Sequence, residues 1–132
     1  MHNISVIVRV ASVDCWSCGA EGELISSLLL SRGVDSLECS VSDLTGYPQL
    51  GAEIMESIAN KAVTGVLKPR FSGTLQRTYM SNGCAHCDAL FGQSYEIHTR
   101  CEERDVAAFA PDAGWIWNDV LDALLAAHGG NK

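Results

Sequence analysis

Two short cysteine motifs constrain this chain more than any other feature of its 132 residues. They are the C-x-x-C pairs Cys15/Cys18 and Cys84/Cys87. A two-residue spacer lets two thiolates from one tight turn converge on a metal, and two such turns supply the four ligands of a closed tetrahedral zinc site. Each pair follows a run of residues that is typical of a strand. The sequence therefore predicts a zinc ribbon in which Cys15, Cys18, Cys84 and Cys87 bind one zinc ion.

The residue that follows each pair fits a metal-binding turn. Gly19 and Asp88 both tolerate the positive φ that such a turn often needs after its second thiolate. Two other interpretations of the cysteines stay open: buried, reduced thiols without a metal, or a thiol-disulfide oxidoreductase in which Cys15 attacks and Cys18 resolves. The redox alternative is disfavoured for two reasons. A redox C-x-x-C normally opens a helix, and Gly19-Ala20-Glu21-Gly22 is a poor helix start. The second cysteine pair would also have no role in the redox reaction.

The chain between the two pairs, residues 19–83, is far longer than the spacing of about 15 to 20 residues in a compact four-cysteine site. Loop-closure entropy grows only slowly with length, so a folded insertion is tolerable if it buries its own apolar face. We predict a single domain over 1–132 with an α+β fold. Its zinc-ribbon β-hairpins lie within 3–98 and are joined by a one-helix insertion at 23–73, and a C-terminal helical extension at 99–130 packs on the sheet.

Alternating hydrophobicity predicts strands at 3–14, 34–44 and 74–80, and a short return strand at 94–98. Residues 23–30 suit either a helix face or a strand, and we favour the strand because a ribbon needs a return strand there. Pro48 fits the first turn of a helix that ends before Gly65. The segment 68–73 contains a proline and a glycine, which indicate a loop.

The C-terminal part of the chain reads as helical. Thr99 and Glu102 have the spacing of a capping box, which predicts a short helix to about Phe109. Asp112 is expected to cap the last helix, which ends at Gly129-Gly130. We expect Trp115 or Trp117 to anchor this helix on the sheet.

Composition is that of an ordinary globular protein, with 47% hydrophobic and 19% charged residues. The N-terminus has no basic segment before its first strand, so we expect no secretory signal and a cytoplasmic location. Six cysteines would then stay reduced, which favours metal binding over a disulfide framework. We expect Cys39 and Cys101 to be small buried hydrophobes, and His86 and His98 to lie at the surface. Trp16 is expected to pack on the insertion.

The net charge is −7, and four thiolates with one Zn²⁺ would add a further −2. This sign disfavours nucleic acid as a partner. Between residues 57 and 87, however, there are four basic residues and no acidic one. We therefore predict a protein partner that binds through this basic segment, with a nucleic-acid-binding zinc ribbon through Lys61–Arg77 as the alternative. The candidate partner-binding residues are Lys68, Arg70, Phe71 and Arg77, and a solvated loop is the competing interpretation of the same residues.

The chain lacks the short motifs that mark nucleophile elbows, phosphate loops, dinucleotide sites or H-E-x-x-H metalloproteases. A catalytic zinc keeps one coordination position open for water, whereas four thiolates close the site. The sequence therefore predicts a structural zinc site in a protein that is not an enzyme.

The run from Tyr79 to Gly92 resembles the signature of uncharacterised bacterial split zinc-ribbon proteins, which read approximately YxxNxCxHCGAxxGxxxLH. Three other features fit the same pattern: the first cysteine pair, the spacing of Arg70, Ser72 and Thr74, and the segment Phe109-Ala110-Pro111. The chain departs from it at Asp88, where the family tends to glycine, in the spacing of Phe91 before Gly92, and at Ile97 before His98. None of these departures removes a ligand. The resemblance implies zinc binding and no established activity.

Overall fold

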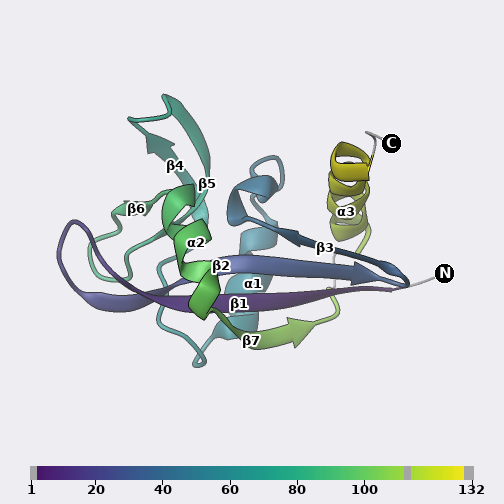
Figure 1. The fold of residues 1–132 in the computed structure, drawn as a ribbon, viewed down its shortest axis with the longest axis horizontal. Helices are drawn as coiled ribbons and strands as arrows, with labels where there is room; N and C mark the ends of the chain where they lie inside the picture. Colours follow the sequence, from purple (N-terminus) through teal and green to yellow (C-terminus); the bar gives the residue numbers. More distant parts are fainter. Residues whose placement is uncertain (1–2, 112–113, 130–132) are drawn as a thin grey trace.

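The computed structural model describes residues 3–111 and 114–129, which form an α+β fold with two antiparallel sheets (Figure 1). The first sheet has the strand order β3 (Asp35–Cys39), β2 (Glu21–Arg32), β1 (Ile4–Asp14) and β7 (Arg104–Phe109). The second has the order β4 (Lys68–Ser72), β5 (Arg77–Gly83) and β6 (Leu90–Phe91). The helices are α1 (Leu50–Ile58), α2 (Gln93–Thr99) and α3 (Gly114–Gly129), with 3-10 turns η1 (Val41–Leu44) and η2 (Arg100–Glu102). The predicted fold class is confirmed.

The long β1–β2 hairpin is the centre of the fold. In β1 the side chains of Ile4, Val6, Val8 and Val10 are all buried on the core side, as their alternation predicts. β2 is a strand, as we favoured for residues 23–30, and it is buried without a break from Leu24 to Leu28. Figure 1 shows α2 crossing one face of this sheet while α1 lies behind it. A strand covered on both faces explains why this stretch also reads as a helix.

The main core lies between the first sheet and helices α1 and α3. Trp117 is completely buried there, its ring lies edge-on to Phe109 at 6.1 Å, and its Nε1 donates to Glu53 Oε2 on α1 at 3.0 Å. The prediction that one tryptophan anchors the last helix is confirmed, whereas Trp115 is exposed. No helix among the residues placed by the structure is long and apolar enough to cross a lipid bilayer.

Three predicted elements are wrong. The expected loop at 68–73 contains β4, an edge strand in which Pro69 is tolerated because its missing N–H faces no partner strand. The expected return strand at 94–98 is α2, and the two-residue β6 is the strand that pairs with β5. The expected helix from Thr99 to Phe109 is only the turn η2 followed by β7. The Thr99 hydroxyl donates back to the Tyr95 and Glu96 carbonyls, so it forms no capping box.

Other boundaries differ by several residues. The strand predicted at 34–44 ends at Cys39, and η1 follows it. The middle helix begins at Leu50, after Pro48, and ends at Ile58. Cys39 is buried as expected, but Cys101 is exposed, so the same expectation is wrong for Cys101. The predicted cap Asp112 and the terminal Gly130 lie outside the described residues.

Candidate metal centre

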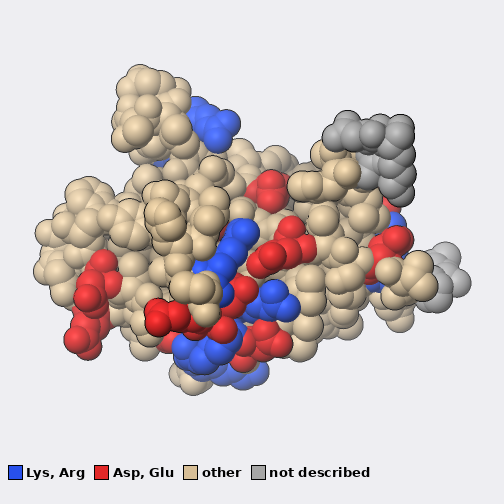
Figure 2. Space-filling view, in the orientation of Figure 1, with Lys and Arg blue, Asp and Glu red and all other residues tan. Residues whose placement is uncertain are grey.

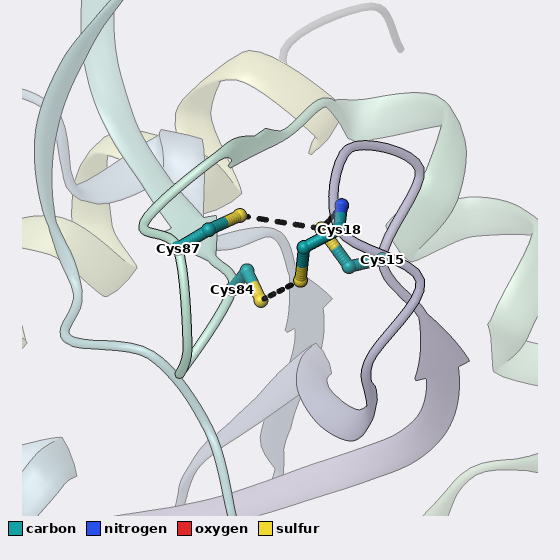
Figure 3. A group of neighbouring side chains, drawn as sticks. All are labelled: Cys15, Cys18, Cys84 and Cys87. Carbon is teal, nitrogen blue, oxygen red and sulfur yellow. Dashed lines mark hydrogen bonds between the residues drawn. The ribbon is translucent and has the colours of Figure 1, made fainter.

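The two C-x-x-C turns face each other (Figure 3), at the end of the molecule where the β1–β2 hairpin turns (Figure 1). The first turn joins β1 to β2, and the second joins β5 to β6. The four Sγ atoms all lie within 4.8 Å of one another, with Cys15 Sγ 3.6 Å from Cys87 Sγ and Cys18 Sγ 3.7 Å from Cys84 Sγ. These distances are far longer than the S–S bond of about 2.05 Å in a disulfide. The structure therefore brings the four predicted cysteines into an arrangement that could hold a metal ion.

The two cross-turn distances between the sulfurs agree with a tetrahedral thiolate site. Four sulfurs at about 2.3 Å from a zinc ion lie about 3.8 Å from one another along the edges of the tetrahedron. The two closest cross-turn distances are 3.6 and 3.7 Å. Each joins a cysteine of one turn to a cysteine of the other, so an ion at the centre would connect the two turns.

The two turns are built in the same way, although they are far apart in the sequence. The N–H of Cys15 donates to the Ala20 carbonyl at 2.9 Å, and the N–H of Cys84 donates to the Ala89 carbonyl at the same distance. The residue after each pair donates its N–H back to the carbonyl of the first cysteine. That residue has a positive φ in both turns, 74° at Gly19 and 63° at Asp88, which confirms the prediction made for both.

Backbone amides point at the first cysteine of each pair. The N–H groups of Ser17 and Cys18 lie 3.3 and 3.4 Å from Cys15 Sγ, and the N–H of His86 lies 3.3 Å from Cys84 Sγ. The Cys18 N–H above all lowers the pKa of Cys15 to about 6, against the effect of burial. Amides of the second turn likewise lower the pKa of Cys84. Both leading cysteines are therefore prepared to bind a metal as thiolates.

The pKa of Cys18 shifts in the opposite direction to those of the two leading cysteines. A hydrogen bond with the Ala20 backbone lowers its pKa, but burial and the neighbouring sulfurs raise the pKa to about 11 overall. Four sulfurs this close together do not all ionise unless a cation balances their charge. The cluster thus has the electrostatics of a site that is completed by a metal ion.

A buried arginine holds the second turn in place. Arg70 on β4 is only 9% exposed, and its Nη2 donates to Asp88 Oδ1 at 2.6 Å and to the Val66 carbonyl at 3.0 Å. Its Nη1 donates to the Ser81 carbonyl at 2.8 Å. Lys68 Nζ lies 2.8 Å from the other carboxylate oxygen of Asp88. The hydrogen bonds from Arg70 and then Lys68 lower the pKa of Asp88. The sequence predicts only the backbone conformation of Asp88, so the ion pair between Asp88 and Arg70 was missed.

The burial of Arg70 corrects one member of the predicted basic patch. Arg70 is buried against the second cysteine turn, so it does not face a partner, whereas Lys68 stays exposed and shares the single Asp88 carboxylate with Arg70. Phe71 and Arg77 are exposed, as is Lys61, and the Arg77 guanidinium lies 5.6 Å from the centre of the Tyr79 ring. The signal that could have revealed the pairing is that Asp88 is the first acidic residue after a long basic stretch.

We expect Asp88→Asn to destabilise the protein by about 1–3 kcal/mol, because it removes a charge partner from a buried guanidinium while keeping a residue that tolerates positive φ. Urea unfolding of the metal-loaded protein measures this change. Asp122→Asn is the matched control: Asp122 forms a 2.7 Å ion pair with Arg32 at an exposed position, so its loss should cost at most about 0.5 kcal/mol. Equal effects of the two substitutions would show that the turn does not depend on Arg70.

The remaining predicted residues lie outside the cluster. His86 and His98 are both exposed, as expected. Trp16, between the two cysteines of the first turn, is 60% exposed, and its Nε1 donates to the Leu90 carbonyl at 2.8 Å. It therefore contacts β6, beyond the second turn, and the expected packing on the insertion is not what fixes its ring.

Comparisons of the chain with protein-family models, with curated proteins and with solved structures found no significant match. The geometry of the cysteine cluster therefore carries the functional proposal.

Proposed function

We propose that this protein is a zinc-binding domain with a structural site of four cysteines, of the kind found in bacterial split zinc-ribbon proteins, and that it acts by binding another protein. The observation that carries the proposal is the convergence of four Sγ atoms from two matched turns within 4.8 Å of one another. Four thiolates at tetrahedral spacing favour zinc, because soft sulfur ligands and a tetrahedral geometry suit this ion.

A structural role follows from the ligand set. Four protein ligands fill the tetrahedron and leave no position for water or substrate, so the proposed site is not a hydrolytic one. The site instead connects the β1–β2 hairpin to the β5–β6 hairpin, which belong to different sheets. Zinc would then add a link between two parts of the fold that the Asn82–Ile25 hydrogen bonds also join.

Metal content tests the proposal directly. Protein purified without chelator should contain about one zinc per chain by elemental analysis. In a thiol titration of the native protein, the exposed Cys101 should react quickly, and the four clustered cysteines should react only after a chelator is added. Less than about half an equivalent of zinc, together with rapid reaction of the clustered thiols, would contradict the proposal.

The thiol-disulfide alternative has one feature in its favour and one against. The lowered pKa of Cys15 suits a nucleophile, but Cys15 is buried, whereas an attacking thiolate must be reached by its substrate. Insulin reduction by metal-free protein separates the two proposals. Catalysis that is lost on Cys15→Ser would favour the oxidoreductase, and we expect no catalysis.

A further inference from the structure

A hollow of about 410 Å³ lies beside the cysteine cluster. It is bounded by the first metal-binding turn, the tip of the β4–β5 hairpin and the start of α2. Figure 1 shows the hairpin rising above this end of the molecule, and Figure 2 shows that the surface there carries few charged side chains. The lining residues are uncharged and mostly aromatic, aliphatic or hydroxyl-bearing: Trp16, Ser72, Thr74, Leu75, Tyr79, Leu90, Gly92, Gln93, Ser94 and Tyr95.

The apolar side chains of this hollow are unusually open to solvent. Trp16 is 60% exposed and Leu75 is 46% exposed, although both are large and apolar. The Trp16 ring does not move freely, because its Nε1 is bound to the Leu90 carbonyl and its backbone belongs to the first turn. The Tyr95 ring, which also lines the hollow, packs against the Phe91 ring with their centres 5.7 Å apart. A concave site walled by fixed aromatic rings is typical of pockets that receive an apolar anchor.

A cationic group adjoins the hollow. Tyr79 and Gln93 line both this hollow and a neighbouring polar one of about 280 Å³ that is also lined by Arg77 and Asp43. The Arg77 guanidinium lies over the Tyr79 ring, and Tyr79 lines both hollows. Arg77 is the one arginine within 3–111 and 114–129 that forms no ion pair, whereas Arg9, Arg32, Arg70, Arg100 and Arg104 all do. In a chain with 16 acidic and 9 basic residues, an arginine without a carboxylate partner is available to an external anion.

The uncharged hollow and the adjoining arginine together favour one class of occupant. The hollow accepts an apolar side chain and would exclude a charged one, because no charged residue lines it. The adjoining arginine favours a carboxylate a few ångströms away. A nucleic acid needs several cations for its phosphates, and among the described residues only Lys61 and Arg77 lack an ion pair. An acidic peptide segment needs only one cation to pair with its carboxylate.

We propose that the hollow beside the metal centre binds an extended acidic segment of a partner protein. The segment inserts one aromatic or large aliphatic side chain between Trp16, Leu75 and Tyr95, and it places an adjacent carboxylate on Arg77. This inference deepens the proposed function and rests on it, because Trp16 is positioned by the two cysteines that flank it. It moves the partner surface from the buried Arg70 to the other side of the β4–β5 hairpin tip.

Three synthetic hexapeptides test the inference: acetyl-GSWEEG-amide, its charge-reversed form GSWKKG and its anchor-deleted form GSSEEG. Each is titrated into ¹⁵N-labelled protein whose zinc content has been measured, while NMR follows the Trp16 Nε1–H and Arg77 Nε–H signals. We expect GSWEEG to shift both signals and to bind at least tenfold more tightly than either control peptide. Equal binding of the three peptides, or binding that leaves Trp16 unmoved, would overturn the inference.

Variants of the protein assign the two contacts. Arg77→Glu should weaken GSWEEG binding at least tenfold, and Leu75→Ser should weaken it while the preference over GSWKKG persists. Lys61→Glu is the matched control, since Lys61 is the other exposed cation without an ion pair among the described residues and lies outside the hollow. An equal loss with Lys61→Glu would show general charge attraction and overturn the specific site.

Three further outcomes are decisive. Micromolar binding of a (dT)₁₂ oligonucleotide at physiological salt that is lost with Arg77→Glu would replace the peptide with a nucleic acid and overturn the inference. Protein that carries one zinc but binds none of the peptides would overturn this inference alone and leave the structural zinc site standing. Protein that contains no zinc would contradict the proposed function, on which this inference rests.

Discussion

Protein stripped of its metal should lose the three-stranded sheet and most of its stability. The free energy of zinc binding to four thiolates is on the order of 10 kcal/mol, comparable to the whole stability of a domain. We expect a chelator, or Cys84→Ser, to abolish the amide-exchange protection of β5 and β6 and to leave little soluble protein. Hydrogen exchange read out by mass spectrometry, with circular dichroism on the same samples, measures both effects.

The size of this effect follows from the small apolar cluster around the four cysteines, since among the described residues of β5 only Met80 reaches the main core. The apolar cluster there has only four buried members among the described residues: Cys15, Leu24, Cys84 and Phe91. Two of the four are the proposed ligands themselves. A further connection between the sheets is polar: the Asn82 amide bonds both the N–H and the carbonyl of Ile25, each at 2.8 Å. Such a small core does not offset the conformational entropy of ordering two hairpins.

Cys101→Ser is the control for this experiment. Cys101 is exposed and lies outside the cluster, so its replacement should leave metal content, exchange protection and solubility unchanged. Chelator-treated protein that keeps protected β5 and β6 amides would contradict a structural role for the metal, whatever its affinity.

The cysteine cluster was predictable from the sequence because its signal is local. A two-residue spacer forces two sulfurs into one turn, and only another such turn completes the site. The positive φ at Gly19 and Asp88 follows from the same local geometry. The β1 strand was equally clear, since one of its faces is buried and the alternation is clean from Ile4 to Val10.

The wrong elements are those decided by distant neighbours. β7 has little intrinsic strand signal, yet its backbone pairs with the free edge of β1. Residues 94–98 form a helix because they pack across β2, which the sequence does not reveal. The burial of one member of the basic segment could not be predicted for a similar reason. Its most central cation, Arg70, finds Asp88 through the fold, and a charge count along the chain cannot show that burial.

Glu96 is the least expected residue in the structure. It lies on α2 and is completely buried, and among the residues that the structure describes neither carboxylate oxygen has a hydrogen bond of good geometry, although the Asn82 side chain and the Val41 N–H lie near enough to act on it. Burial raises its pKa to about 7. The Asn82 side chain of β5, the Val41 N–H of η1 and the Arg100 charge of η2 oppose that shift, and Asp43 of η1 reinforces it. Glu96 should therefore be largely protonated below neutral pH in the folded state.

Replacing Glu96 with glutamine should stabilise the protein in a pH-dependent way. In the unfolded chain the carboxyl ionises near pH 4.3, whereas in the folded protein it does so near pH 7, so the folded state binds the extra proton between these values. The folding stability of the wild type should fall by up to about 1.4 kcal/mol per pH unit across this window, and level off above pH 7. Glu96→Gln removes this loss. Its advantage should be about 0.5 kcal/mol at pH 4.5 and reach about 3.5 kcal/mol at pH 8.

This difference is measured by urea unfolding of the zinc-loaded wild type and Glu96→Gln proteins at matched pH values between 5.5 and 8. Acid causes loss of zinc in both proteins, and comparing them at the same pH cancels that effect. Glu56→Gln on the exposed face of α1 is the control, and it should change stability by less than about 0.5 kcal/mol at every pH. The diagnostic feature is the slope, since a substitution that merely improves packing would stabilise equally at all pH values. A pH-independent difference, or one that shrinks as the pH rises, would show that Glu96 is ionised in the folded protein and that a partner for it forms in solution.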